Sequence, residues 1–454
     1  MRVGVCVLCF LLPIPVCAAA IRVSLADVEE SACANSPRLK AARDEASAAS
    51  ARADAQFAAF FPKISLDGNY RYNAVVPEIT LPFAGARVQK LSDNAIYSIG
   101  PSLSWTLWDS GAVRFAWEGA QAAARAKAHE MDATRRQVLL AGRTAYVQAT
   151  LAAEQVRMVS DALELARAQY ADISLNFTAG TKSRMDKLSS HQEVLARTIQ
   201  LSQARSELAV SLRELSAVTG NVYCKDTCIP SDSRARDDVY DEIAAPNIAV
   251  TMDSIGDLER VFGAYRGAKM LRAHPNVAAL NELAESARLA AKSASTGLWP
   301  KIQLSARTSL DYPNGPEFKE FVQNSFGANL AWPLFDAGAT KNRVLENNKT
   351  RDSAINRGAQ AGVDIAREWE KTNDRILHLK EQEKINAIAL READELASIT
   401  YKAYTAGSLS YMEVQNANYR TLEAKIRMVK TKAQIFANLA IMASLADEEK
   451  QEMK

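Results

Sequence analysis

The chain has 454 residues, of which 55 are Lys or Arg and 53 are Asp or Glu, so its formal net charge at pH 7 is +2. A chain so close to charge balance has no broad electrostatic attraction for nucleic acid, and we expect no nucleic-acid partner. The four histidines are scattered without the spacing of metal ligands, and no glycine-rich phosphate loop follows a predicted strand. We therefore expect neither an enzyme nor a bound cofactor or metal.

Residues 1–20 have the pattern of a secretory signal peptide. Arg2 precedes an apolar run that two prolines interrupt, and small residues follow, so cleavage is expected near residues 18–20. Two alternatives stay open. One is an uncleaved membrane anchor, although that would need roughly 20 apolar residues without a break. The other is lipid attachment at Cys17, whose preceding residues match the usual pattern poorly.

An exported chain without a transmembrane helix is periplasmic, secreted or a barrel of the outer membrane, and no later segment is long and apolar enough for such a helix. Export leaves Cys33, Cys224 and Cys228, which are too few for a disulfide scaffold. Cys224 and Cys228 could form a small disulfide in an oxidising compartment. Unpaired thiols and a metal site are the alternatives.

The sequence contains two similar copies of one unit. Phe61-Pro62-Lys63-Ile64 and Trp299-Pro300-Lys301-Ile302 lie 238 residues apart, whereas Trp105–Gly111 and Trp332–Gly338 lie 227 apart. One insertion of 11 residues between the two predicted strands of the first copy explains the change. The glycine that ends each of the latter two motifs, Gly111 or Gly338, lies 69 residues before Gly180 or Gly407, and this equality indicates a unit of fixed length.

These copies predict the domain organisation. We expect a signal peptide at 1–20, a first repeat at 21–220, a linker or equatorial region at 221–261, a second repeat at 262–445 and a charged tail at 446–454.

Proline is absent from 102–229 and from 334 to the end of the chain, so each copy has room for long helices. In the first copy, small or apolar residues recur every 3.5 positions over about five heptads, which is typical of a left-handed coiled coil. A helix from Ala112 to about Phe177 would be roughly 100 Å long, and a second stripe predicts the helix that returns. In the second copy Glu383 and Asn386 interrupt the pattern. The first seam consists of Val138, Gly142, Ala145, Ala149, Ala152, Val156, Val159, Leu163, Ala166, Tyr170 and Ile173.

Four segments alternate between apolar and polar residues: 64–72, 97–107, 302–312 and 326–332. A period of two over about ten residues is typical of a transmembrane β-strand with its apolar side chains toward lipid and its polar side chains toward the lumen. The segments form two hairpins at matched positions of the repeat, which a soluble coiled-coil rod does not require. The predicted lumen residues include Asp67, Arg71, Arg307 and Asp311.

Aromatic residues gather where the predicted strands meet the predicted helices. We expect them to form a girdle at the periplasmic interface of the membrane. Core packing at the base of the strands is the alternative. The residues are Phe61, Trp105, Trp108, Trp299, Trp332 and Phe335.

Four strands cannot close a barrel, and an open sheet edge in lipid would leave backbone groups unpaired at several kcal/mol each. Two chains would give roughly eight strands and a lumen filled by side chains, whereas three would give about twelve and room for a pore. The polar lumen face favours three chains. The predicted fold is therefore an α+β membrane protein. Four transmembrane β-strands per chain contribute to a trimeric, roughly 12-stranded β-barrel, which is continuous with a long α-helical coiled-coil periplasmic tunnel.

These residues resemble the TolC-like outer-membrane efflux proteins over nearly the whole mature length. The resemblance rests on the tandem repeat, the aromatic-Pro-Lys-Ile entry to the first strand of each copy and the Trp-x-Leu-aromatic-Asp-x-Gly exit from the second strand. It rests also on the Ala-Gly-Thr/Ser-x-Ser-x-x-acid turn between the long and the returning helix.

The resemblance implies a homotrimer in the outer membrane of a diderm bacterium, in contact with membrane lipid and with a large periplasmic portion. It implies a periplasmic adaptor and an inner-membrane pump of the ABC, RND or MFS type as partners. The implied activity is export of small molecules, or of proteins in type I secretion. A periplasmic coiled-coil adaptor or rod without a membrane barrel is the alternative, but it does not predict the four strands.

The turns between the long and the returning helices are where the family places its gate and its adaptor contact. The glycines have a structural reason of their own, since helices often end at a left-handed glycine, and hydroxyl residues beyond them could cap the next helix. The residues implied to form the tip turns and the adaptor contact are Gly180, Thr181, Ser183, Gly407, Ser408 and Ser410.

The resemblance implies that Asp186, Tyr404, Glu413 and Asn416 form the gate. Three copies would bring six carboxylates, from Asp186 and Glu413, toward one axis and so favour cations over anions. In the family, the tyrosine and the aspartate at the positions of Tyr404 and Asp186 join a closing network with an arginine. Leu409 occupies that arginine position here, and Asn416 replaces a second gate aspartate. The closing hydrogen bonds of this chain must therefore differ.

Overall fold

The computed structural model describes residues 21–81, 87–223, 250–263, 270, 273–315 and 317–446. The predicted signal peptide, Cys17, Cys224, Cys228 and the tail from residue 447 lie outside the described residues. No helix in the described part is both long enough and apolar enough to cross a membrane. The chain divides into two units, which we call the helical unit (residues 1–39, 135–272 and 365–454) and the strand unit (residues 40–134 and 273–364).

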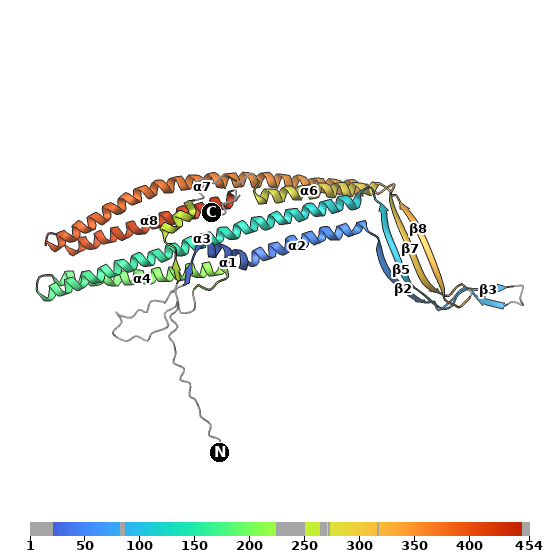
Figure 1. Ribbon diagram of the computed structural model, residues 1–454, viewed down its shortest axis with the longest axis horizontal. Helices are drawn as coiled ribbons and strands as arrows, with labels where there is room; N and C mark the ends of the chain where they lie inside the picture. The colour runs from blue at the N-terminus through green and yellow to red at the C-terminus, as the bar shows by residue number, and fades with distance from the viewer. Residues whose placement is uncertain are drawn as a thin grey trace, which may run out of the picture. The chain divides into compact units, whose positions relative to one another are not determined.

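The strand unit contains a four-stranded antiparallel sheet (Figure 1). Its strands are β2 (Lys63–Tyr72), β5 (Ala95–Trp108), β7 (Lys301–Tyr312) and β8 (Phe321–Ala331). They are ordered β2-β5-β7-β8, so the two hairpins of the repeat lie side by side. Within the described residues, β2 and β8 each pair with one neighbour, and these two strands form the edges of the sheet.

The register of the sheet separates apolar from polar side chains. Ile64 pairs with Leu103, which pairs with Ala306, which pairs with Phe326, so one row of one face is apolar across all four strands. The neighbouring row, Ser65, Ser102, Arg307 and Ser325, belongs to the opposite face because successive residues of a strand point to opposite sides. Thr308 and Asn324 form a polar pair on the otherwise apolar face.

Hydrogen bonds connect three of the predicted lumen residues, Asp67, Arg307 and Asp311, to serines of the polar face. Arg307 donates to the Ser98 hydroxyl at 2.8 Å, and that hydroxyl donates to Asp311 at 2.6 Å. Asp67 accepts hydrogen bonds from Ser65 and Ser102. The polar face is thus linked by hydrogen bonds across three strands.

Strand β8 begins at Phe321, five residues before the first alternating residue that the sequence analysis identified. This end was not predicted because Asn324 occupies an apolar-face position, which hides the alternation there. Trp332 lies just beyond the strand. A second small hairpin, β3 (Glu78–Leu81) with β4 (Arg87–Lys90), lies between β2 and β5, where the first copy carries its insertion.

In the strand unit, α6 (Pro275–Ser295) contacts the two long helices. The first part of α3 (Ala112–Thr178) approaches α6 at Gly119, and the first part of α7 (Ala339–Thr405) approaches it at Gly358. Each long helix begins in the same way. Asp109 accepts from the backbone N–H of Val113 at 2.7 Å, and Asp336 accepts from that of Thr340 at 2.8 Å. The aspartate of the repeated motif is therefore the residue that caps the long helix.

A short 3₁₀ helix leads into the first strand of each hairpin: η1 (Ala58–Phe60) follows α2 (Pro37–Phe57), and η5 (Thr296–Leu298) follows α6. The indole of Trp105 donates to the Phe60 carbonyl at 3.0 Å, and that of Trp332 donates to the Leu298 carbonyl at 3.2 Å. The two copies therefore use the same contact to fix each strand to the helix end beside it.

The helical unit contains the rest of α3 and α7, the returning helices α4 (Arg184–Thr219) and α8 (Tyr411–Leu445), and two shorter helices, α1 (Leu25–Asn35) and α5 (Ile255–Gly263). Strands β1 (Ile21–Val23) and β6 (Val250–Met252) form a small parallel sheet. The seam predicted in α3 is confirmed, since all of its residues are buried except Val156 and Tyr170, which are partly buried.

Polar residues that interrupt the pattern in α7 find partners on α8. The Asn386 amide donates to the Thr431 hydroxyl at 3.0 Å, and Glu383 lies 3.7 Å from the Lys432 amine. These contacts satisfy groups that would otherwise weaken the packing of the second hairpin. The core of the unit includes the fully buried Tyr146, whose pKa is raised above its ordinary value, mainly by burial.

Gly100 of β5 lies directly against the backbone of β7 at Thr308 and Ser309. An added Cβ would overlap the carbonyl oxygen of Thr308. We expect Gly100→Ala to push the strands apart and to lower the free energy of unfolding by about 3 kcal/mol. Gly68→Ala is the matched control on β2, because its Cβ would meet only Ile99 at 3.8 Å, an ordinary contact distance. Thermal unfolding of both variants checks the prediction, and equal midpoints would contradict it.

Candidate functional site at the helix tips

Helix α3 ends in a turn that two backbone hydrogen bonds close. Gly180 N–H donates to the Phe177 carbonyl at 3.0 Å, and Thr181 N–H donates to the Asn176 carbonyl at 2.9 Å. This is a Schellman motif, and it requires a left-handed residue at its glycine position. Gly180 has φ of 77°. Helix α7 ends in the same motif, with φ of 81° at Gly407, so the fixed spacing of the repeat positions two equivalent turns.

The returning helices begin differently in the two copies. Ser183 is the N-cap of α4 and forms a capping box with Asp186, whose carboxylate accepts from the Ser183 hydroxyl at 2.7 Å. Ser410 is the N-cap of α8, but its side chain makes no capping hydrogen bond. The predicted capping by Thr181 and Ser408 is wrong. The Thr181 hydroxyl donates backward to the Asn176 carbonyl, and both residues precede the N-cap positions.

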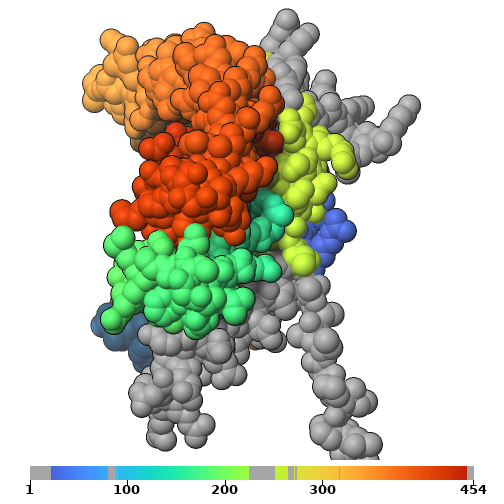
Figure 2. Space-filling model, turned by 90° about the vertical axis from the view of Figure 1, so that its left-hand side faces the viewer, coloured from blue at the N-terminus to red at the C-terminus, as the bar shows by residue number. Residues whose placement is uncertain are grey.

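The two hairpins of the helical unit contact each other close to these turns. Figure 2 shows both tips from the outside, the α3–α4 hairpin in green and the α7–α8 hairpin in orange to red. Ile173 of α3, Tyr404 of α7, and Tyr411 and Val414 of α8 form a buried apolar cluster. The rings of the two tyrosines lie 5.6 Å apart. Tyr404 was predicted as a gate residue and Tyr411 was not, because a single aromatic residue in a helix has no distinctive pattern.

Polar contacts join the same hairpins along the next helical turns. The Tyr411 hydroxyl donates to the Gln169 side-chain oxygen at 3.2 Å, and Asn418 donates to the same oxygen at 3.3 Å. Gln415 donates to the Ser189 carbonyl at 3.0 Å. The first and the second hairpin are therefore held together by apolar packing and by three hydrogen bonds in this region.

Tyr404 is the most constrained of the predicted gate residues. Its side chain is 5% exposed, and its hydroxyl has no hydrogen-bond partner among the described residues. Burial, with smaller electrostatic contributions from the Asp186 carboxylate and the Tyr401 phenol, raises the pKa of Tyr404 to about 12. No hydrogen bond joins Tyr404 to Asp186 in the described part of the chain, where the Asp186 carboxylate accepts from the backbone N–H and the hydroxyl of Ser183.

A lysine that the sequence analysis did not single out contacts Tyr404. The Lys182 amine lies 3.8 Å from the centre of the Tyr404 ring and 3.5 Å from the Tyr404 carbonyl oxygen. Glu413, Asn416 and Leu409, which the resemblance assigned to the gate region, are exposed on the second hairpin. A single chain therefore buries only one of the predicted gate residues, Tyr404.

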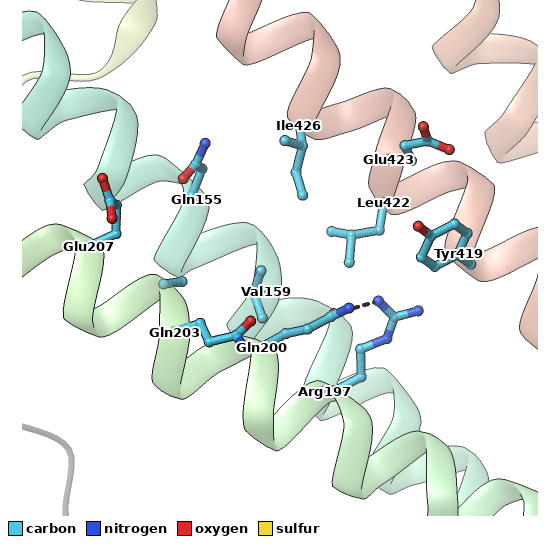
Figure 3. A pocket seen from close by; sticks show the side chains of 11 residues that line it. Gln155, Val159, Arg197, Gln200, Gln203, Glu207, Tyr419, Leu422, Glu423 and Ile426 are labelled. Carbon is cyan, nitrogen blue, oxygen red and sulfur yellow. Dashed lines mark hydrogen bonds between the residues drawn. The ribbon is translucent and has the colours of Figure 1, made fainter.

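A separate hollow of about 410 Å³ lies between α3, α4 and α8 (Figure 3). Both polar and apolar side chains line it. Arg197, which is 4% exposed, donates to Gln200 at 2.8 Å and forms an ion pair with Glu193 at 2.7 Å. Among the described residues no cluster of His, Cys, Asp or Glu could hold a metal ion. The hollow contains none of the residues that the sequence analysis assigned to a site.

The predicted girdle residues lie at the ends of the strands. Five of them are exposed, from 46% at Trp108 to 89% at Phe335, and Trp105 is partly buried. Phe61 also belongs to an aromatic group with Phe57, Phe60 and Trp117, in which the Phe57 and Trp117 rings are 5.4 Å apart. The sequence analysis missed Trp117, which lies inside α3 rather than at a strand end.

Comparison with known proteins identifies the family. The model of the outer membrane efflux protein family matches residues 28–221 and 268–446. The chain therefore belongs to that family, which is an efflux family rather than an enzyme family, and it is a protein of the outer membrane. No curated protein is similar enough in sequence to count as a match.

Solved structures of outer-membrane channels share the fold. CmeC of Campylobacter jejuni is 16% identical, with a TM-score of 0.70 over 94% of this chain and 87% of that one. The open state of MtrE of Neisseria gonorrhoeae is 15% identical, with a TM-score of 0.70 over 93% and 88%. VceC of Vibrio cholerae is 16% identical, with a TM-score of 0.68 over 93% and 95%. The fold class predicted from the sequence is confirmed.

We expect Gly407→Ala to loosen the tip, because a left-handed residue with a Cβ costs about 1–2 kcal/mol. Nothing lies within 4 Å of the added Cβ, so the effect comes from the backbone alone. Gly362→Ala is the matched control within α7, where the added Cβ also meets nothing, and it should stabilise the helix by about 0.5–1 kcal/mol. Amide hydrogen exchange at 401–410 measures the loosening. Equal exchange in the two variants would contradict this account.

Proposed function

We propose that three copies of this chain form one channel that carries small molecules or proteins out of the cell, working with a periplasmic adaptor and an inner-membrane pump. The observation that carries the proposal is the four-stranded sheet, whose two outer strands are unpaired on one side in the described part of the chain. In hydrocarbon each unpaired backbone group costs several kcal/mol, so such a sheet requires further strands.

Copies of the same chain supply those strands most simply. The apolar face would then contact lipid throughout, and the polar face with Asp67, Arg307 and Asp311 would line the lumen. Two chains would give roughly eight strands and a filled interior, whereas three would give about twelve and an open one. The charged side chains of the polar face support the open interior, because burying them away from water would have a large free-energy cost.

The aromatic residues at the strand ends support a membrane boundary at that level. Trp299, Trp332 and Phe335 are exposed in the single chain, and amphipathic aromatic rings favour the interface between lipid and water. With Phe61, Trp105 and Trp108 they would form the girdle on the periplasmic side. Trp105 and Trp332 would have two roles there, since each also fixes a strand to the preceding helix end.

The tips are the proposed gate and the proposed contact with the adaptor. The turns at Gly180 and Gly407 are exposed and flanked by exposed apolar side chains, Met185 on α4 and Met412 on α8. A partner helix could cover these residues together with Thr181, Ser183, Ser408 and Ser410. Asp186 and Glu413 would bring six carboxylates of a trimer near one axis, which favours cations. Asn416 lies one helical turn beyond Glu413 and would line the same region.

A periplasmic rod without a barrel is the other function considered. A rod does not require a sheet with one apolar and one polar face. Membership of an outer membrane efflux family also supports the channel. The pump, of the ABC, RND or MFS type, would provide the energy and the choice of substrate. The channel itself would need neither a cofactor nor an active site.

We expect the detergent-purified protein to have the mass of a trimer and to give small, cation-preferring currents in planar bilayers. Replacing Asp186 and Glu413 by Asn and Gln should lower the preference for cations several-fold, because the carboxylate field at the tip is lost. Glu164→Gln is the control, since this exposed carboxylate of α3 lies about 20 Å along the helix from the turn. A monomer without channel activity would rule out the trimeric channel. An unchanged ion preference would remove the two carboxylates from the gate.

A further inference from the structure

We propose that Lys182 is the latch that holds the two helical hairpins of one chain together at the tip, and that it acts on the ring of Tyr404 rather than on its hydroxyl. The inference rests on the proposed function as a gated channel. It assigns the closing contact to a residue of the first hairpin that the sequence pattern did not indicate.

The position of the Lys182 amine provides two attractions at once. It lies 3.8 Å from the centre of the Tyr404 ring, within the range of a cation–π contact. It also lies 3.5 Å from the Tyr404 carbonyl oxygen, in the last turn of α7. Carbonyl groups at the C-terminal end of a helix carry partial negative charge, so a cation is favoured there. Lys182 is part of the turn between α3 and α4, so each of these contacts links one hairpin to the other.

The hydroxyl of Tyr404 does not contribute to this contact. It is buried and has no hydrogen-bond partner in the described part of the chain. A buried hydroxyl without a partner weakens a structure rather than closing it. The ring, in contrast, packs against Tyr411 and receives the lysine. The aromatic face is therefore the part of Tyr404 that joins the hairpins.

The facing turn offers no cation of its own at the corresponding place. Leu409 lies between Gly407 and the N-cap Ser410, is 38% exposed, and has no polar group. The cation that contacts the Tyr404 ring therefore comes from the first hairpin, where Lys182 directly precedes the N-cap Ser183. The capping box of Ser183 with Asp186 fixes the backbone next to Lys182, which limits the conformational entropy lost when the lysine makes its contact.

The latch is the contact between hairpins that lies closest to the turns. The hydrogen bonds of Tyr411 with Gln169, and of Gln415 with Ser189, lie further along the helices. Releasing Lys182 therefore frees the two turns while the helices above them stay packed. Opening of this kind would be confined to the tip.

The first test compares variants of Lys182 in planar bilayers. Lys182→Met keeps the length of the side chain but removes the charge, and we expect it to raise the open-to-closed ratio on the order of tenfold, the size of a partly desolvated cation–π contact. Lys182→Arg keeps a cation that can lie over the ring, and should stay close to the wild type. Lys187→Met is the matched control, because the Lys187 amine lies 5.1 Å from the Phe177 ring within the first hairpin alone.

The second test asks which part of Tyr404 matters. Tyr404→Leu removes the ring, whereas Tyr404→Phe removes only the hydroxyl. We expect Tyr404→Leu to raise the open-to-closed ratio at least several-fold more than Tyr404→Phe. The opposite order, or equal effects of the two substitutions, would overturn the assignment of the contact to the ring.

Amide hydrogen exchange separates failure of the latch from failure of the channel. We expect faster exchange at 179–183 and 406–410 in Lys182→Met than in Lys187→Met, whether or not the protein conducts ions. Faster exchange without any current in any variant would retain the latch and overturn the channel. Currents in all variants, with Lys182→Met indistinguishable from Lys187→Met in both measurements, would overturn the latch and retain the channel.

Discussion

The unpaired edges of a four-stranded sheet determine most of what this chain can be. Hydrocarbon provides no partner for backbone N–H and C=O groups, so β2 and β8 have to find other strands. The register puts Ile64, Leu103, Ala306 and Phe326 in one apolar row. This arrangement is favourable when that face contacts lipid. Helix α7 likewise exposes apolar residues along its length, which a single chain leaves uncovered. They include Val363, Leu377, Ile385, Ile388 and Ile399.

The two copies of the repeat share the contacts that begin and end their long helices and that fix their strands. They differ in the segment between the first two strands and in the cap of the returning helix. An aspartate caps each long helix, an indole fixes each second strand, and a Schellman turn ends each long helix. Within the residues that the structure describes, the first copy alone has an extra β3–β4 hairpin, and the first tip alone has a capping box. The tip is consequently asymmetric within one chain. The first turn has the capping box and supplies the cation, and the end of α7 supplies the aromatic ring.

Sequence periodicity predicted the long elements well, because their burial repeats over many turns. Helix α3 was expected from Ala112 to about Phe177 and runs to Thr178. The start of β8 was missed because Asn324 breaks the alternation, and β3 and β4 were missed because four residues are too few to show a period. At the tip, the glycine turns follow from local backbone chemistry and could be predicted. The contact of Lys182 with Tyr404 joins residues 222 positions apart, and no local pattern encodes it.

Helices α3 and α7 each contain 67 residues, and this equality has a consequence for how such a chain can evolve. Every inserted residue would move a turn by about 1.5 Å and rotate it by about 100°. A length change in one hairpin alone would carry Lys182 away from Tyr404 and break the seam on the same face. Insertions and deletions are therefore tolerated only as matched pairs, in multiples that restore the heptad. The equal length of α3 and α7 is therefore constrained more strictly than the sequence of either helix.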